Sequence, residues 1–302
     1  MPELPEAETI ARELHKQLSN QTLIRVLANR RDVFHGPSKP ERCLPGKRVV
    51  EVFRRGKRVV LRLHPDGLLV VRLGMTGRLT ICPTDRPVEL HTHLRMTFGD
   101  RGLELRFRDP RRFGGVWFHE AAEMEHDSQL GNLGLEPLEV TLHDFRRALS
   151  RGRQIKALLM DQAVIAGLGN IYSDESLHAA GLHPLNKADT LDFKQTRRLL
   201  RAIKTTLRRA VRFNGTTFMD YRRTDGEAGS FQEYHRVYQR EGRPCRMCGT
   251  PIVRITAAGR ATFFCPACQR VQKSRRLTGR RQNLPKTKTV RTKAAQRSAK
   301  AT

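Results

Sequence analysis

The stretch CRMCGTPIVRITAAGRATFFCPAC, residues 245–268, decides the fold of the last part of the chain that we expect to be ordered. Two Cys-x2-Cys pairs, Cys245 with Cys248 and Cys265 with Cys268, stand 16 residues apart. Four thiolates at this spacing satisfy tetrahedral zinc and leave no open coordination position. The alternative is four free or disulfide-linked cysteines. The spacing therefore predicts one structural Zn²⁺ that takes no part in chemistry.

The residues between the two cysteine pairs predict a β-hairpin. Ile252, Val253 and Ile255 form one apolar strand, RATFF forms the other, and residues 256–259 form the turn. This turn presents Arg260. In a basic protein such an arginine is either a phosphate clamp or an ordinary surface residue, and the spacing leaves both open.

The charge of the chain points to a polyanionic partner. The 302 residues include 57 Lys and Arg against 30 Asp and Glu, for a formal net charge of +27. Residues 270–302 hold twelve of these cations and no acid, so the rest of the chain still carries +15. A field of this sign attracts nucleic acid first; the alternative is a charge kept for solubility or high salt. Residues 270–302 also contain almost no large apolar side chains, so we expect disorder there.

Several classes of protein are excluded by composition. No run approaches 18 apolar residues, so no membrane span is expected. The first residues are acidic and precede no apolar segment, unlike a secretory signal, so we expect an intracellular protein. Six cysteines in a chain this long do not suggest a disulfide framework, and Cys43 and Cys82 fit small core positions.

The periodicity of apolar residues predicts two kinds of structure in succession. Residues 5–18 have the spacing of an amphipathic helix. Residues 22–118 contain short alternating stretches such as GLELRFRD, which predict strands of an antiparallel sandwich or barrel. Glycines around Pro137 mark a linker, and helical patterns follow near residues 142 and 154 and after Asn170. The longest, residues 192–212, has a face of lysines and arginines that is usually a solvated surface.

Two glycine-flanked loops carry the side chains that a wedge into duplex DNA requires. RLGMTGRL holds Met75, and RDPRRFGG holds Arg111 and Phe113. The alternative for Met75 and Phe113 is core packing.

Two further positions could bind anions. GLGN precedes a helical pattern, so its Asn170 lies either in an anion-binding turn or in a simple glycine turn that caps the helix. Lys57 follows Gly56 at the start of a strand. It is a phosphate-binding or catalytic lysine, or a polar turn residue.

The chain opens MPELPEAETI. Pro5 and Glu6 suit the first turn of a helix. If Met1 is removed, Pro2 presents a secondary amine with a pKa of about 8, part of which is neutral near pH 7. Such an amine can attack an aldehydic sugar carbon to form an iminium, and Glu3 lies within reach to move protons. The alternative is an ordinary Met-Pro start.

Together these segments resemble one family, the formamidopyrimidine-DNA glycosylases, which share a superfamily with the endonuclease VIII-like enzymes. The matching segments are PELPE, LGMTG, DPRRFGG, GLGNIYSDESL, GTTFMDY, DGEAGSF, VYQREGRPCRMCGTPI and RATFFCPACQ. They run in order from Pro2 to about Gln269, and PELPE in place of PEGPE favours the formamidopyrimidine branch. The departures are the residues from Met219 to Arg223 and the basic tail.

The resemblance implies roles for residues that the patterns left open. It makes Pro2 the nucleophile, Glu3 the acid and Glu6 a second active-site carboxylate. The implied catalytic residues are Pro2, Glu3, Lys57 and Arg260. The implied DNA contacts are His91, Arg111, Asn170, Lys156, Arg153, Met75 and Phe113. Among these, Asn170 grips phosphates together with Arg260, while Met75, Arg111 and Phe113 fill the gap left by an extruded nucleotide.

The implied fold is α+β: an N-terminal helix plus antiparallel β-sandwich, a helix–two-turn–helix domain and a C-terminal zinc-finger β-hairpin. The expected boundaries are 1–131 for the helix and sandwich, 132–142 for a linker, 143–235 for the DNA-binding helices, 236–269 for the finger and 270–302 for the tail.

The implied function is a DNA glycosylase and AP lyase of base excision repair that removes oxidised purines, formamidopyrimidines and 8-oxoguanine, from duplex DNA. The damaged nucleotide is extruded because its sugar is unreachable in the stack. Alternatives are an endonuclease VIII-like glycosylase for oxidised pyrimidines, or a catalytically silent DNA-binding relative. We expect a monomer in the bacterial nucleoid, whose partner is damaged double-stranded DNA and which needs neither a membrane nor a small-molecule cofactor.

Truncation after Gln269 should weaken binding to undamaged duplex and flatten its salt dependence. Each phosphate neutralised adds about 0.9 to the slope of log affinity against log salt. If a third of the twelve tail cations engage, the slope should change by roughly 3 to 4. Binding titrations over a salt series measure this. A fall in the single-turnover rate would instead mean that the tail shapes the active site.

Overall fold

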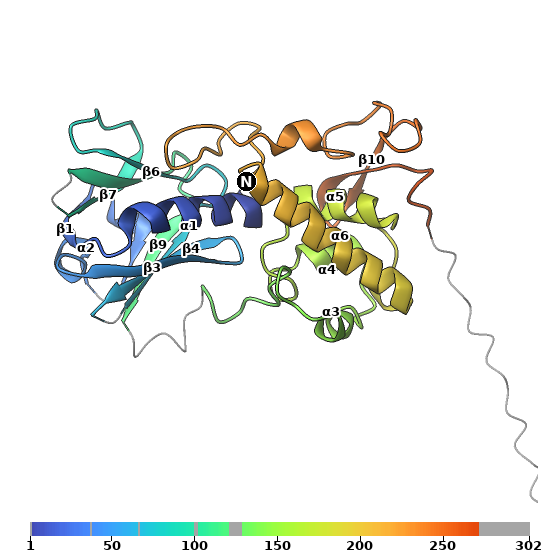
Figure 1. Cartoon of the computed structure of the whole chain (residues 1–302), viewed down its shortest axis with the longest axis horizontal. Coiled ribbons are helices and arrows are strands. Elements are labelled where there is room, and N and C mark those ends of the chain that lie inside the picture. Colours follow the sequence, from blue (N-terminus) through green and yellow to red (C-terminus); the bar gives the residue numbers. More distant parts are fainter. Residues whose placement is uncertain (1, 37, 66, 100–101, 121–128, 272–302) are drawn as a thin grey trace, which may run out of the picture. The chain divides into compact units, whose positions relative to one another are not determined.

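The computed structural model describes residues 2–36, 38–65, 67–99, 102–120 and 129–271 (Figure 1). Met1 and the tail beyond residue 271 fall outside this range, so both the loss of Met1 and the disorder of the tail stay predictions. The described residues belong to one compact unit, and none of their helices is long and apolar enough to cross a membrane. The five domain boundaries also stay predictions.

Helix α1, Leu4–Leu18, confirms the N-terminal helix. Pro5 stands in its first turn, where a missing N–H costs no hydrogen bond. Its apolar stripe is buried against strands β3, Arg48–Arg55, and β4, Arg58–His64. The buried residues of the stripe are Ala7, Ile10, Ala11, Leu14 and Leu18.

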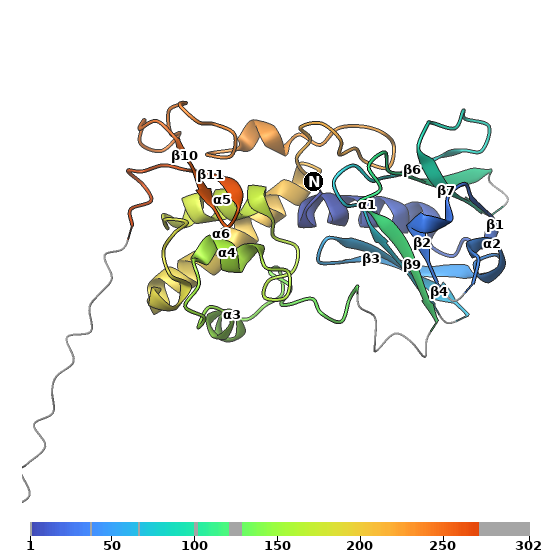
Figure 2. The ribbon, with the colours of Figure 1, turned by 180° about the vertical axis from the view of Figure 1, so that it is seen from behind.

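The β-sandwich is confirmed as two sheets that share one apolar core (Figures 1 and 2). The first has the order β2-β9-β5-β4-β3, with β2 Phe34–His35, β9 Gly115–Glu120, β5 Gly67–Arg72, β4 Arg58–His64 and β3 Arg48–Arg55. The second has the order β1-β7-β8-β6, with β1 Leu23–Ala28, β7 Thr92–Phe98, β8 Leu103–Arg108 and β6 Arg78–Pro83.

All the strand pairs described in the two sheets are antiparallel except one. The two residues of β2 run parallel to β9. The sequence gives no sign of β2, because two residues are too few to show a period of two. Two short helices, η1 Arg31–Val33 and α2 Pro40–Cys43, complete the connection between β1 and β3.

The helical patterns are confirmed as four helices with a core of their own. These are α3 Leu142–Ala148, α4 Ile155–Met160, α5 Asn170–Ala180 and α6 Phe193–Arg212. The start of α6 is fixed by a capping box, in which Asp192 Oδ1 accepts from Gln195 N at 2.8 Å and Gln195 Oε1 accepts from Asp192 N at 2.9 Å. Leu4, the first residue of α1, is buried in this second core. The two halves of the molecule are therefore joined at the beginning of α1.

The zinc-finger hairpin consists of β10 Val253–Ala257 and β11 Arg260–Phe264. Its turn is shorter than predicted, because Ala257 pairs with Arg260 and only residues 258 and 259 remain between the strands. Two 3₁₀ helices, η3 Ala188–Thr190 and η4 Phe231–Tyr234, lie on either side of α6 in the chain.

Candidate active site

The carboxylate of Glu3 lies on the N-terminus of α5. Its Oε2 accepts a hydrogen bond from Gly169 N at 2.7 Å, and its Oε1 accepts from Ile171 N at 2.9 Å. The first N–H groups of a helix lack intrahelical partners and carry partial positive charge, so a carboxylate is stabilised there. Next to it, Leu4 N donates to Gly167 O at 3.0 Å. Pro2, which is buried, is held beside α5 through its bond to Glu3.

Gly169 leaves room for two oppositely charged side chains. A Cβ at this position would lie 2.5 Å from a carboxyl oxygen of Glu3 and 2.7 Å from Lys57 Nζ. Burial lowers the pKa of Lys57, and the carboxylates of Glu3 and Glu6 oppose that shift. The positive charge of Arg260 also lowers the pKa of Lys57, so Arg260 lies within electrostatic range of the Lys57 ammonium group. The structure therefore gathers the four predicted catalytic residues around the start of α5.

Glu6 begins a buried polar chain that the sequence did not reveal. Its carboxylate accepts from Glu3 N at 2.7 Å, from the Tyr172 hydroxyl at 2.5 Å and from Thr216 N at 2.7 Å. Burial raises the pKa of Glu6, and the nearby Glu3 raises it further. Thr216 Oγ1 lies 3.1 Å from the Tyr172 hydroxyl and 3.2 Å from His235 Nε2. Burial lowers the pKa of His235 to about 4, so its ring is neutral near pH 7.

The zinc-finger hairpin is bound to the same end of α5. Asn170 Nδ2 donates to Ala261 O at 2.9 Å. Asp174 Oδ2, one turn further along the helix, accepts from Phe263 N at 2.9 Å. Both contacts lie within three residues of Arg260, whose side chain is exposed. Arg260 is thus presented to solvent next to Asn170, as a pair of phosphate contacts requires.

Lys156 and Arg153, both expected to contact DNA, have different surroundings. Lys156 is fully buried, and its Nζ donates to Asp174 Oδ1 at 2.7 Å and to Thr262 Oγ1 at 2.6 Å. Its ammonium group therefore joins α4, α5 and the hairpin. Arg153 is 47% exposed and pairs with Asp161 at 2.7 Å. Contacts of either residue with DNA stay predictions.

The two loops predicted to form a wedge are held together by Asp109, which is fully buried. Its carboxylate accepts from Thr76 Oγ1 at 2.5 Å and from Gly114 N at 2.7 Å. Its own N–H donates to His91 O at 3.1 Å, so the segment that carries the exposed His91 is fixed to the same residue. One residue, through its carboxylate and its backbone N–H, thus positions all three segments. No pattern in the sequence indicates these contacts of Asp109, because they join segments that are far apart in the chain.

The wedge side chains themselves are exposed. Met75 is 41% exposed and Phe113 is 46% exposed, so the alternative of core packing is wrong for both. The Arg111 guanidinium lies over the Phe113 ring, 4.5 Å from its centroid. An apolar pair with an arginine therefore projects from neighbouring loops.

The unusual segment from Met219 to Arg223 is fixed to the β-sandwich. Tyr221 is buried in the sandwich core, and Arg223 Nε binds Glu13 Oε1 at 2.6 Å. The next residue, Thr224, donates to Glu13 Oε2 from its N–H and its hydroxyl. Met219 remains 77% exposed. The segment is therefore anchored at Tyr221 and Arg223, whereas the side chain of Met219 is in solvent.

The four cysteines of the hairpin fit zinc. Their sulfurs all lie within 4.8 Å of one another, and Cys248 Sγ lies 3.4 Å from both Cys265 Sγ and Cys268 Sγ. Four Zn–S bonds of 2.3 Å place tetrahedral sulfurs about 3.8 Å apart. All six cysteines are free thiols, so the disulfide alternative is wrong in this structure. The four ligands leave no position for a substrate, which makes the zinc structural.

Comparison with known protein families identifies the three parts. Residues 1–116 match the formamidopyrimidine-DNA glycosylase N-terminal domain, residues 133–221 match the H2TH domain of the same enzymes, and residues 242–271 match a zinc finger found in FPG and IleRS. These matches define the class: a DNA repair glycosylase with a zinc finger.

Individual relatives support the same family assignment. The chain is 41% identical over 275 residues to formamidopyrimidine-DNA glycosylase of Herpetosiphon aurantiacus, covering 89% of this chain and all of the relative. The structure of MutM (Fpg) from Thermus thermophilus has 39% identity and a TM-score of 0.80, covering 90% of this chain and all of that one. A mutant Lactococcus lactis FPG in complex with Fapy-dG-containing DNA has 33% identity and a TM-score of 0.82, covering 89% and 100%. The chain belongs to the formamidopyrimidine-DNA glycosylase family.

Metal analysis should find one zinc per chain, and Cys248→Ser should lower that content and weaken DNA binding. The reason is that loss of a ligand loosens the hairpin that presents Arg260. The sandwich core contains no zinc ligand, so its circular dichroism should persist. Cys43→Ser is the matched control and should change neither property. Active protein without zinc would contradict the assignment.

Lys156→Met should destabilise the protein far more than Arg153→Met. The first leaves Asp174 buried without its cation, a loss of about 3–5 kcal/mol, whereas an exposed pair contributes about 0–1 kcal/mol. Urea unfolding at a fixed zinc concentration measures both free energies. Similar losses for the two variants would show that the buried pair has no special role.

Proposed function

We propose that this protein is a bifunctional DNA glycosylase and AP lyase that removes oxidised purines from duplex DNA in base excision repair. The observation that carries the proposal is the convergence of Glu3 and Lys57 on Gly169, with Pro2 attached to Glu3 and Arg260 nearby. An amine, a carboxylate and a cation at one point suit attack on a sugar carbon beside a phosphate.

In the proposed reaction, the neutral amine of Pro2 attacks C1′ of the extruded deoxyribose and the bond from C1′ to the base breaks. The departing base takes a proton, and opening of the sugar ring leaves an iminium between Pro2 and C1′. Loss of a proton from C2′ then expels the 3′ phosphate, and a second elimination expels the 5′ phosphate. Glu3 is the carboxylate placed to move protons in these steps. Hydrolysis of the iminium returns the free amine.

The remaining residues are assigned to DNA binding. Asn170 is bound to the backbone of Ala261, the neighbour of Arg260, and the two residues suit contacts with phosphates around the lesion. Met75, Arg111 and Phe113 suit the space vacated by the extruded nucleotide. Zinc supplies no chemistry in this scheme and keeps Arg260 in position. These assignments include His91, whose loop is fixed to the wedge through Asp109.

Oxidised purine is the substrate class that the sequence and its relatives favour. PELPE at residues 2–6 is the pattern of the formamidopyrimidine branch. A Lactococcus lactis relative is described in complex with Fapy-dG-containing DNA, and another complex of that protein contains an oxidised pyrimidine. The relatives named above are bacterial, which supports a role on a bacterial chromosome.

Borohydride added during turnover should cross-link the protein to duplexes that contain 8-oxoguanine or formamidopyrimidine, through residue 2. Reduction of the iminium makes the adduct permanent, and peptide mapping locates it. A tag on the N-terminus should abolish cross-linking because the amine is acylated, whereas a C-terminal tag should not.

Adducts that map to Lys57 or another lysine would overturn the role of Pro2. Faster cleavage of a duplex with an oxidised pyrimidine than of either purine lesion would show that oxidised pyrimidines are the preferred substrates. No adduct with any lesion would indicate a catalytically silent relative.

Phe113→Ala should slow cleavage of a lesion in an intact duplex by at least about tenfold and affect an unpaired lesion much less. Unstacking costs a few kcal/mol per base step, and the wedge offsets part of that cost. Single-turnover kinetics on paired and unpaired substrates measure the difference. Phe193→Ala, at a residue 51% exposed on α6, is the control and should leave both rates unchanged. Equal slowing on the two substrates would contradict the proposal that Phe113 fills the space left by the extruded nucleotide.

A further inference from the structure

The outward face of α6 carries positive charge that the proposed function does not use. The 20 residues of α6 include eight Lys and Arg and no acid. Its apolar stripe is buried, so the cations lie on the opposite side of the helix. We call the exposed cations the α6 basic face. They are Lys194, Arg197, Arg198, Arg201, Arg208, Arg209 and Arg212.

Little in the protein neutralises the α6 basic face. Among the described residues, none of its cations forms an ion pair within 4.0 Å, whereas Arg153 and Arg223 elsewhere do. Arg209 lies over the Tyr234 ring at 4.7 Å, a contact that leaves its charge in place. Cations three and four residues apart on a helix repel each other. A surface that served solubility alone would mix both signs, so this arrangement fits an anionic ligand.

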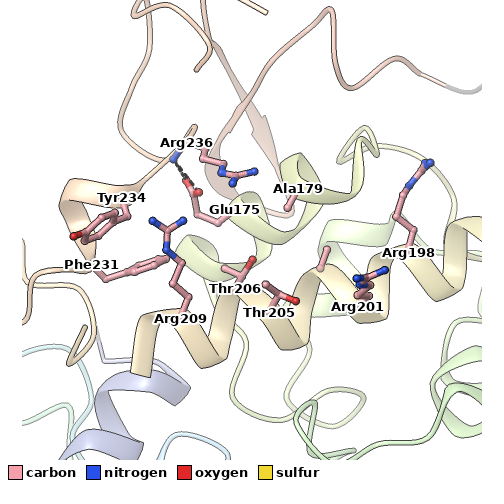
Figure 3. Close-up of a pocket in the computed structure, with 11 residues that line it drawn as sticks. Glu175, Ala179, Arg198, Arg201, Thr205, Thr206, Arg209, Phe231, Tyr234 and Arg236 are labelled. Atoms are coloured by element: carbon pink, nitrogen blue, oxygen red, sulfur yellow. Dashed lines mark hydrogen bonds between the residues drawn. The ribbon is translucent and has the colours of Figure 1, made fainter. Parts of the chain in front are cut away.

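The α6 basic face borders a hollow of about 250 Å³ (Figure 3). Its rim contains Arg198, Arg201, Arg209 and Arg236, and its wall includes Phe231 and Tyr234. The one acid in the hollow is Glu175, which is buried. Its carboxylate accepts from the backbone N–H groups of residues 236–238 at 2.9–3.0 Å, so it is already engaged.

A second hollow lies along the same helix. It measures about 340 Å³ and is lined by Arg197, Arg201, Lys204 and Arg208. Arg201 borders both hollows. The cations therefore line two depressions along α6 that have Arg201 in common, and a phosphate backbone could follow them.

The α6 basic face lies away from the candidate active site. Helix α5 contacts both α6 and β11. In Figure 1 α6 is in front of α5, and in the reverse view of Figure 2 α5 and β11 are in front of α6. A duplex gripped by Asn170 and Arg260 therefore leaves the α6 basic face open.

We propose that the α6 basic face is a second DNA-binding surface, which holds the backbone of another duplex segment while the active site is occupied. From Arg197 to Arg208 the helix rises about 17 Å, the length of about five phosphates of one strand. Guanidinium groups match phosphate geometry. Duplex DNA is the expected occupant. When the active site is bound to DNA, neighbouring segments of DNA are the most abundant polyanion around the protein.

Sedimentation velocity of the full-length protein with an excess of a short undamaged duplex, about 12 base pairs long, tests the proposal at low salt. We expect two duplexes per chain. The variant R197Q/R201Q/R208Q should bind one duplex, because the second site loses three of its phosphate contacts. The control K16Q/R25Q/K39Q removes three exposed cations from the sandwich half of the chain and should still bind two.

One duplex per native chain, or two for the α6 variant, would overturn the proposal; the latter would assign the second duplex to another surface such as the tail. Displacement of the second duplex by a polyglutamate peptide at lower concentration than by competing DNA would also overturn it, in favour of an acidic protein partner. Because the duplex carries no lesion, the stoichiometry does not depend on the proposed reaction. The single-turnover rate of the α6 variant, measured separately, should equal that of the native enzyme.

Discussion

The contact between the Glu3 carboxylate and the N-terminus of α5 is the constraint on which the rest of this molecule depends. It joins residue 3 to residues 169–171, which belong to a different half of the fold. Leu4 completes the joint by entering the apolar core of the helices. Since the sandwich supplies Lys57 and the helices supply Asn170, the joint also sets the distance between the Lys57 ammonium group and the Asn170 amide. Glycine at position 169 is required there, because any side chain would occupy the place where the two charges meet.

A second joint, between Lys156 and Asp174, gives the hairpin its position. Zinc makes the hairpin rigid, but rigidity alone would not place Arg260 beside Asn170. The buried ion pair does so by linking α4, α5 and β11 through Thr262. The two joints lie one helical turn apart on α5. This helix is thus the common reference for groups contributed by all three parts of the chain.

Sequence reasoning succeeded where a local pattern fixes the chemistry. The cysteine spacing predicted the zinc cluster. Apolar periodicity predicted α1 and α6 to within a few residues, and it predicted strands in residues 22–118 without the bounds of most of them. It failed where a role depends on tertiary contacts. A lysine in a helical pattern reads as a surface charge, yet Lys156 is fully buried. No local pattern distinguishes Asp109 and Glu13 from other acidic residues. Nothing in the neighbouring sequence shows that Asp109 fixes three loop segments or that Glu13 anchors the segment from Met219 to Arg223. Met75 and Phe113 could equally have been core residues, since hydrophobicity does not show which way a loop side chain points.

The joint at Glu3 has a consequence for the synthesis of the protein. Residue 3 leaves the ribosome more than 160 residues ahead of Gly169, and about 260 ahead of Arg260. At 5–20 residues per second, this leaves roughly 10–50 s during which the sandwich can fold while its reactive end has no partner. The nascent chain therefore carries its proposed amine without the groups that would direct it to a sugar. An unfinished polypeptide therefore has no complete site, and the site becomes complete only after the zinc-finger hairpin has left the ribosome.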